Sequence, residues 1–229
     1  SGYMKEGFSQ IFMISSTGGK SIQVTTEKFN HYSFDWMSGS DGFVFSSNYT
    51  EDWEYDFRNS EIYSISVNGS NLQQLTDRNG PDMGAAVSPD GKSIAYLGYE
   101  DKVQTYQINN LTIMDIDGSN KRTINIDLDR NIESLKWSAD GKNLYFMYDN
   151  YGNTKIATTN LTGRVRKLID DVGGTSIGRP YGGGSFSVSS EGEISYTLTS
   201  PYHPADIGYY EGNSFKRLTN LNNDLFRGK

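Results

Sequence analysis

Residues Ser88 to Tyr96 read SPDGKSIAY, a polar turn with an acidic residue and a glycine, followed by a strand of alternating apolar residues. The same pattern recurs as SDGFVF from Ser40, SADGKNLYF from Ser138 and SSEGEISY from Ser189. Each turn contains a glycine, and these glycines are separated by 49, 50 and 51 residues: Gly42, Gly91, Gly141 and Gly192. A period of about 50 residues is typical of a propeller or a solenoid.

A second motif alternates with the first and has the pattern of a two-stranded hairpin. Its five copies are FMISSTGGKSIQVT ending at Thr25, YSISVNGSNLQQLT at Thr76, IMDIDGSNKRTI at Ile124, NLTGRVRKLI at Ile169 and YYEGNSFKRLT at Thr219. Their turn glycines are separated by 50, 49, 45 and 49 residues, so the second series keeps step with the first. Asn68-Gly69 and Asp117-Gly118 predict type I′ turns, in which both turn residues have positive φ.

Each period therefore contains four strands, which is the composition of one propeller blade. We predict an all-β fold, a β-propeller of four-stranded antiparallel blades with about four and a half blades in this chain, because strand alternation is present and helical periodicity is not. The half blade covers residues 8–25, and the full blades cover about 30–76, 82–126, 131–169 and 183–219. Alternating apolar residues, such as Ile94 and Tyr96 or Leu144 and Phe146, are expected to pack between neighbouring blades.

The first repeat is incomplete. Residues 8–25 supply only the outer hairpin of a blade, whereas a ring closes around typically 4–8 complete blades. An open sheet edge on a half blade would also invite aggregation. We therefore expect that further sequence precedes Ser1 in the intact protein.

Charge and composition exclude several classes of function. The 229 residues carry a formal net charge of −7, whereas nucleic acid or anionic lipid requires an excess of Lys and Arg at the contact surface. We therefore expect neither a nucleic-acid nor a membrane partner, and no apolar run approaches the roughly 20 residues needed to cross a bilayer. The chain has no cysteine, which excludes disulfides, a thiol nucleophile and Cys-ligated zinc and favours the cytoplasm.

The Ser-Pro-Asp-Gly-Lys turn, the Ile-Ala-Tyr strand, the Asp-Gly-Ser-Asn hairpin and the closing Leu-Thr resemble the propeller repeat shared by TolB-type proteins and relatives of prolyl oligopeptidase. The resemblance spans nearly the whole chain. After the last blade, Arg217 to Phe226 reads RLTNLNNDLF, which is similar to the segment that leads into the α/β-hydrolase domain in the acylaminoacyl-peptidase branch. The resemblance implies that residues 220–229 begin a linker towards a C-terminal hydrolase domain.

The resemblance also implies a function for these residues. Family members place the Ser, Asp and His of their triad in the hydrolase domain, so no catalytic residue and no cofactor is assigned to this chain. Its propeller would cap the active site of a serine peptidase of the acylaminoacyl-peptidase or dipeptidyl-peptidase kind and admit short peptides. The implied partners are the hydrolase domain, peptide substrates and a second copy of the chain in a homo-oligomer. A TolB-like propeller that binds a partner protein is the alternative, and the reading frame beyond Lys229 distinguishes the two.

Two further patterns imitate functional sites. GTSIG from Gly174 matches the G-x-S-x-G motif that surrounds the catalytic serine of α/β-hydrolases, with Ser176 in the place of that serine. A helix must follow this serine, but the segment that follows Ser176 is too rich in glycine to predict one. The only downstream histidine, His203, lies in a predicted turn. A self-contained hydrolase is therefore the poorest of the alternatives. A calcium loop is matched only in its first half, without the later Gly and Glu, by Asp127, Asp129 and Asn131. We predict a connecting loop in both places and no metal site.

The segment Thr50 to Arg58, TEDWEYDFR, interrupts its blade with acidic and aromatic residues. Exposed aromatic side chains are unfavourable in water without a partner. We therefore predict that Trp53, Tyr55 and Phe57 form an interface with the hydrolase domain or with a second subunit, and a solvated loop is the alternative. The longer insertion Tyr99 to Asn110 is a second candidate with fewer aromatic residues.

Overall fold

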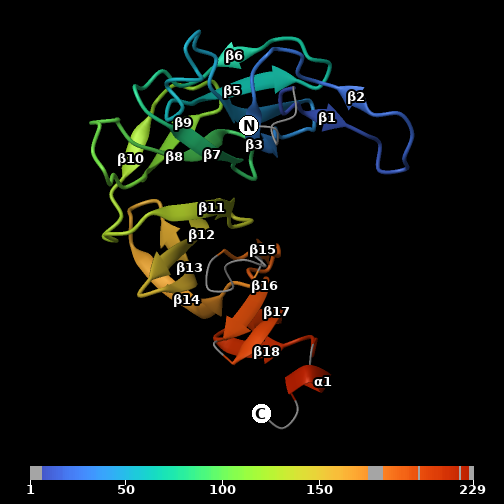
Figure 1. The fold of residues 1–229 in the computed structure, drawn as a ribbon, viewed down its shortest axis with the longest axis vertical. Coiled ribbons are helices and arrows are strands. Elements are labelled where there is room, and N and C mark those ends of the chain that lie inside the picture. Colours follow the sequence, from blue (N-terminus) through green and yellow to red (C-terminus); the bar gives the residue numbers. More distant parts are fainter. Residues whose placement is uncertain (1–6, 175–182, 201, 222, 227–229) are drawn as a thin grey trace. The chain divides into compact units, whose positions relative to one another are not determined.

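A computed structural model of the chain describes residues 7–174, 183–200, 202–221 and 223–226. Within these ranges nearly every regular element is a strand, and the last element is the four-residue helix α1 (Asn223–Phe226), so the all-β prediction is confirmed (Figure 1). No helix in the described part of the chain is long and apolar enough to cross a membrane. The chain divides into two compact units between Ile124 and Asn125.

The first unit contains one strand pair and two four-stranded antiparallel sheets. The pair is formed by β1 (Phe12–Met13) and β2 (Ile22–Gln23). The first sheet contains β3 (His31–Trp36), β4 (Gly42–Ser47), β5 (Glu61–Ser66) and β6 (Gln73–Gln74). The second contains β7 (Asp82–Val87), β8 (Ser93–Gly98), β9 (Asn110–Asp115) and β10 (Arg122–Ile124). In both sheets neighbouring strands are consecutive in the chain, so each sheet is a meander of hairpins.

The second unit contains two further groups of four strands. The first group contains β11 (Ile132–Trp137), β12 (Asn143–Asn150), β13 (Asn153–Asn160) and β14 (Val165–Val172). The second contains β15 (Phe186–Val188), β16 (Ile194–Ser200), β17 (His203–Glu211) and β18 (Ser214–Arg217). The pairing of Val172 with Leu198 joins the two groups at the end of the long strand β14.

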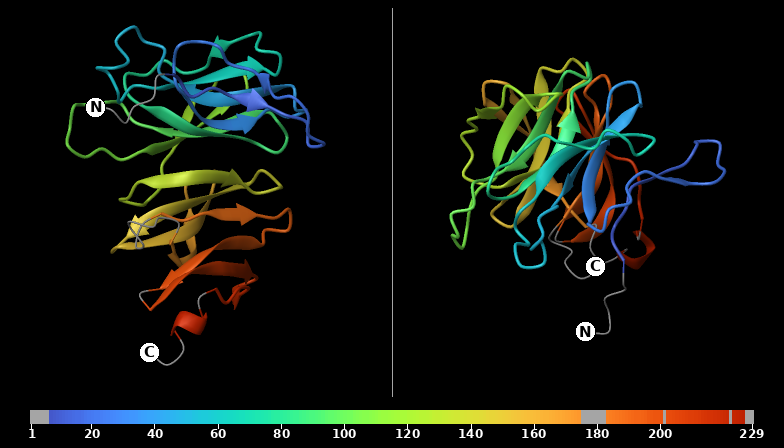
Figure 2. Two further views of the ribbon diagram at one scale, coloured as in Figure 1. Left: turned by 45° about the vertical axis from the view of Figure 1, so that its right-hand side comes forward. Right: turned by 90° about the horizontal axis from the view of Figure 1, so that it is seen from above.

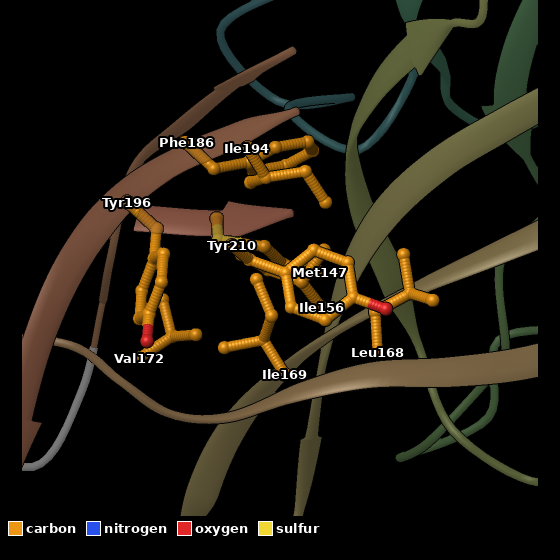
Figure 3. Close-up of a cluster of buried hydrophobic side chains, with 9 residues drawn as sticks. All are labelled: Met147, Ile156, Leu168, Ile169, Val172, Phe186, Ile194, Tyr196 and Tyr210. Carbon is orange, nitrogen blue, oxygen red and sulfur yellow. The ribbon is translucent and has the colours of Figure 1, made fainter. Parts of the chain in front are cut away.

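Within each unit the core lies between adjacent groups of strands. In the first unit, Val44 and Ile62 of one sheet pack with Ile94, Tyr96 and Met114 of the next. In the second unit, Ile156 and Ile169 pack with Phe186, Ile194 and Tyr210, as Figure 3 shows. Burying one such side chain contributes roughly 1.5–3 kcal/mol, so these layers hold neighbouring groups together.

The predicted packing of alternating residues between blades is confirmed for Ile94 and Tyr96, and Leu144 and Phe146 are fully buried. The hairpin β1–β2 contributes Ile11 and Val24 from its flanks to a cluster with Phe43 and Phe45, although its connecting loop reaches away from the rest of the first unit (Figure 2). The outer face of the hairpin leaves Phe12, Ile14 and Ile22 more than half exposed.

In two blades, serine and aspartate side chains close the turn between the first and second strands. Ser88 Oγ donates a hydrogen bond to Asp90 Oδ1 at 2.7 Å and accepts one from the amide of Ser93 at 2.9 Å. Hydrogen bonds from the Ser88 hydroxyl and the Lys92 amide hold the pKa of Asp90 below its usual value. Ser138 and Asp140 repeat this arrangement. The repeated serine is therefore part of the turn that defines the period.

The type I′ prediction for the two hairpins is wrong. Gly69 and Gly118 have positive φ, at 80° and 86°, but Asn68 and Asp117 do not. Instead, Oδ1 of Asn68 accepts hydrogen bonds from the amide and hydroxyl of Ser70, at 3.0 and 2.7 Å. Asp117 makes the same two bonds. These side chains stabilise an Asx turn, which does not require the left-handed conformation at the Asn or Asp.

Candidate functional site

The predicted interface segment lies in the connection between β4 and β5, where the chain makes a series of turns. Asn48 holds its ends together, because Oδ1 accepts from the Thr50 hydroxyl at 2.7 Å and Nδ2 donates to the Asp56 carbonyl at 2.8 Å. The amides of Tyr55 and Asp56 both donate to the carbonyl of Asp52, at 2.8 and 2.9 Å. The connection is therefore an ordered turn structure and not a loose excursion.

The three aromatic residues of this segment differ in their surroundings. Trp53 is half-buried, and its ring meets the ring of Phe8 edge to face at a centroid distance of 5.9 Å. Tyr55 is 86% exposed and Phe57 is 76% exposed. The structure thus places Trp53 and Phe57 beside a cleft and Tyr55 away from it. Whether the three side chains form an interface stays a prediction.

The cleft has a volume of about 460 Å³, which is within the range of roughly 300–1,000 Å³ typical of small-ligand pockets. It lies wholly within the first unit, where the β4–β5 connection meets strands β3 and β7. Its walls are formed by Asn30, Tyr32, Ser33, Ser46, Asn48, Trp53, Glu54, Phe57, Arg58, Asn59, Ser60, Pro81, Met83 and Tyr99.

Two buried polar atoms in the walls have no partner among the described residues. Ser46 is 2% exposed, and its hydroxyl makes no hydrogen bond there; the side-chain oxygen of Asn59 is also buried and unpaired. Buried polar groups are nearly always hydrogen-bonded in native structures. The floor of the cleft therefore offers a hydroxyl and an amide oxygen to a ligand.

The two charged side chains of the cleft differ in whether they have a partner. Arg58 lies 4.0 Å from Asp101 and over the ring of Phe57, at 5.7 Å from its centroid. Glu54 has no ion pair or hydrogen bond among the described residues. The carboxylate of Glu54 is therefore the free charge of the cleft.

The sequence indicated part of this cleft. Trp53 and Phe57 were predicted as contact residues, and Tyr99 begins the second candidate insertion, in which Val103 and Tyr106 are exposed. Ser46 and Asn59 were not identified. The only signal for Ser46 was that two serines end the strand β4, which is buried along its whole length.

The other sequence candidates fall elsewhere. Ser176 lies outside the described residues. His203 Nε2 accepts a hydrogen bond from the guanidinium of Arg217 at 2.8 Å, and Arg217 also pairs with the buried Asp206. Asp127 and Asp129, which match the first half of a calcium-binding loop, are exposed in the connection between β10 and β11. Among the described residues, no three His, Cys, Asp or Glu side chains gather as a metal site would require.

Comparison with curated proteins finds relatives named dipeptidyl-peptidase 5. No family model matches the chain. Dipeptidyl-peptidase 5 of Porphyromonas gingivalis is 25% identical over 138 residues, which are 59% of this chain and 20% of that protein. The probable dipeptidyl-peptidase 5 of Arthroderma benhamiae is 31% identical over 138 residues, 54% of this chain and 19% of that protein. The chain spans about a fifth of the length of these relatives.

Solved structures establish the fold. A putative TolB from Agrobacterium tumefaciens has a TM-score of 0.68 at 17% identity, over 92% of this chain and 74% of that one. A puromycin-hydrolyzing peptidase of Mycobacterium tuberculosis has a TM-score of 0.65 at 14% identity, over 93% and 35% of the two chains. The chain has the fold of part of a β-propeller, and its sequence is similar to that of proteins named dipeptidyl-peptidase 5. The predicted fold class, a partial propeller of four-stranded antiparallel blades, is confirmed.

In this partial propeller the cleft belongs to two consecutive blades. The blade β3–β6 supplies Tyr32, Ser46 and the connection with Trp53, and the blade β7–β10 supplies Met83 and Tyr99. Inner strands and the connections between strands are where propellers commonly present residues to ligands and partners, because these positions are not used for packing between blades.

Proposed function

We propose that this partial propeller is the non-catalytic domain of a serine peptidase whose α/β-hydrolase domain lies elsewhere in the full-length protein. The observation that supports this most is the similarity to proteins named dipeptidyl-peptidase 5, of which the matched part is only about a fifth. In those proteins most of the chain is outside the matched segment, which leaves room for a separate catalytic domain.

The described residues of this chain are consistent with a domain that does not carry out the chemistry. The chain has two histidines. His31 is buried between the carbonyl of Ser9 and the hydroxyl of Tyr49, at 2.9 and 2.7 Å, and burial lowers its pKa. Among the residues that the structure describes, none places a serine hydroxyl against His31 as a general base would require.

We further propose that the propeller limits the size of the substrate. A domain set beside an active site excludes folded chains by steric obstruction while short peptides pass. The expected result is that the full-length protein hydrolyses a short peptide but leaves the same sequence intact inside a folded carrier protein. Equal rates on the two substrates would remove the gating role and leave the domain assignment in place.

A fluorophosphonate probe tests the position of the catalytic serine, because it labels the activated serine of such hydrolases covalently. The full-length protein is treated with the probe, digested, and the labelled peptide is identified by mass spectrometry. Label on a serine outside residues 1–229 is expected. Label on Ser176, with loss of turnover in Ser176→Ala, would instead make this chain a self-contained hydrolase.

The second candidate is a propeller that binds a partner protein, without any catalytic domain. It is favoured by the structural likeness to TolB, which covers 74% of that protein against 35% of the peptidase. A stop codon directly after Lys229 and no fluorophosphonate labelling of the natural protein are the expected observations in that case.

A further inference from the structure

The cleft between β3, β7 and the β4–β5 connection combines three recognition elements. Its floor holds two unpaired polar groups, the hydroxyl of Ser46 and the amide oxygen of Asn59. A peptide unit carries one donor and one acceptor, so its N–H can bond the Asn59 oxygen while its carbonyl accepts from the Ser46 hydroxyl. The two groups therefore have the donor and the acceptor that one peptide unit requires.

The rim of the cleft is suited to a cation. Glu54 lines it and has no partner among the described residues, whereas the guanidinium of Arg58 is engaged by Asp101 at 4.0 Å. Phe57 already holds a guanidinium 5.7 Å from its ring centroid, and Trp53 lies on the same connection. A carboxylate beside aromatic faces attracts an alkylammonium or guanidinium group by charge and by cation–π interaction.

We propose that this cleft is a binding site for a short peptide segment that directs a cationic group to Glu54. The proposal rests on the peptidase function proposed above and adds a preference for positively charged peptides to it. The rings of Trp53 and Tyr32 cover the apolar part of the ligand, and the floor holds its main chain. The cation is either a Lys or Arg side chain or the amino terminus of the peptide.

Isothermal titration of the full 229-residue chain with matched peptides tests the proposal. Two pentapeptides blocked at both ends, Ala-Phe-Lys-Phe-Ala and Ala-Phe-Glu-Phe-Ala, differ only in the central charge. A third, Ala-Phe-Ala-Phe-Ala with a free amino terminus, separates the two sources of the cation. The lysine peptide is expected to bind at least about tenfold more tightly than the glutamate peptide, as one charge-assisted hydrogen bond allows.

Variants connect the binding to the cleft. Glu54→Gln should reduce the preference for the lysine peptide by about tenfold. Glu51→Gln is the control: it removes one negative charge from the same connection, but Glu51 does not line the cleft, so the preference should be unchanged. Ser46→Ala should weaken both peptides equally, because it alters the main-chain contact. Circular dichroism of each variant shows that the fold is retained.

Equal affinity for the lysine and glutamate peptides would overturn the proposal, and so would an equal loss of the lysine preference in Glu54→Gln and Glu51→Gln. The absence of binding at peptide concentrations up to about 1 mM would also overturn it. Saturable binding of the neutral sugar maltotriose that Ser46→Ala abolishes would show that the cleft is a sugar site instead. Binding of the third peptide that depends on Glu54 supports the proposal, with the amino terminus as the cation. The assay measures no hydrolysis, so its failure is separate from a failure of fluorophosphonate labelling.

Discussion

At the scale of single residues, the threonines that close the hairpins connect the two strands of each hairpin. The hydroxyl of Thr76 accepts a hydrogen bond from the amide of Ile62 at 2.9 Å and donates one to the carboxylate of Glu61 at 2.5 Å. Thr25 and Thr219 make the same pair of bonds in their own hairpins. The closing Leu-Thr of the repeat is therefore a hydrogen-bonding device that attaches the outer strand to its neighbour.

Thr76→Val should destabilise the chain. Valine keeps the shape of threonine but leaves the Ile62 amide and the Glu61 carboxylate without this partner, and a buried unsatisfied group costs about 1–3 kcal/mol. Thr76→Ser keeps the hydroxyl and should lose clearly less. Urea unfolding followed by circular dichroism measures both variants. Equal midpoints for the two variants would show that the methyl group, and not the hydroxyl, is what matters.

Glu61 should make stability depend on pH. Burial raises its pKa to about 7 in the folded chain, from 4.5 for a free carboxyl. Between these values the folded chain holds a proton that the unfolded chain releases. The stabilising contribution is therefore complete below about pH 4.5 and is lost as the pH rises through about 7.

Glu61→Gln tests this pH dependence, because glutamine can still accept from Thr76 and does not ionise. Gln10 occupies the same position beside Thr25, so the chain already uses this pair. The variant is expected to be more stable than the natural chain at pH 8. Its free energy of unfolding should also fall less between pH 5 and 8 than that of the natural chain, because the ionisation of Glu61 no longer contributes. Parallel unfolding curves for the two proteins across this range would contradict the assignment.

At the scale of elements, the first strands of three blades are interrupted at the same place. The register of β3, β7 and β11 shifts two to three residues into each strand. The shift coincides with a residue of positive φ: Ser33 at 49°, Gly84 at 65° and Ser134 at 59°. These are β-bulges, which bend a strand and re-aim the side chains beside it. At Ser33 the bulge lies in the wall of the cleft.

The left-handed conformation at these bulges predicts that introducing a glycine stabilises one blade and that replacing a glycine destabilises another. Ser134→Gly should raise stability, because a side chain in this conformation costs roughly 1–2 kcal/mol, partly offset by the entropy of glycine. Gly84→Ala should lower it, although a Cβ there would meet no atom within 4 Å. Thermal unfolding measures both, with Ser134→Ala as a control that is expected to have no gain. Destabilisation by Ser134→Gly would show that the serine hydroxyl outweighs the backbone strain.

The bulges and the threonine bonds mark the limit of what the sequence could predict. Gly91 and Gly141 follow an acidic residue in a short turn, so local chemistry alone located the period and the strands on either side. Serine at a positive φ has no such local signal, and Thr76 finds its partners more than ten residues earlier. Features that depend on the register between paired strands were therefore not predicted.

At the scale of the whole molecule, the candidate site illustrates the same limit. Trp53 and Phe57 were found because aromatic residues in an acidic turn are conspicuous in a sequence. Ser46 and Met83 come from strands of two different blades, and nothing local distinguishes them from other strand residues. The cleft exists because two blades and one connection meet, so its polar floor could be identified only from the structure.

Tyr55 offers a test of the interface at this scale that does not disturb the cleft. Its side chain is 86% exposed and does not line the cleft, so Tyr55→Ser should change stability by no more than about 0.5 kcal/mol. If the side chain contacts a hydrolase domain or a second subunit, the variant of the full-length protein should have an altered KM or an altered mass in multi-angle light scattering. Tyr202→Ser removes an equally exposed tyrosine, at 88%, from the second unit and should change neither. An unchanged mass and unchanged kinetics in Tyr55→Ser would leave this residue as part of a solvated turn.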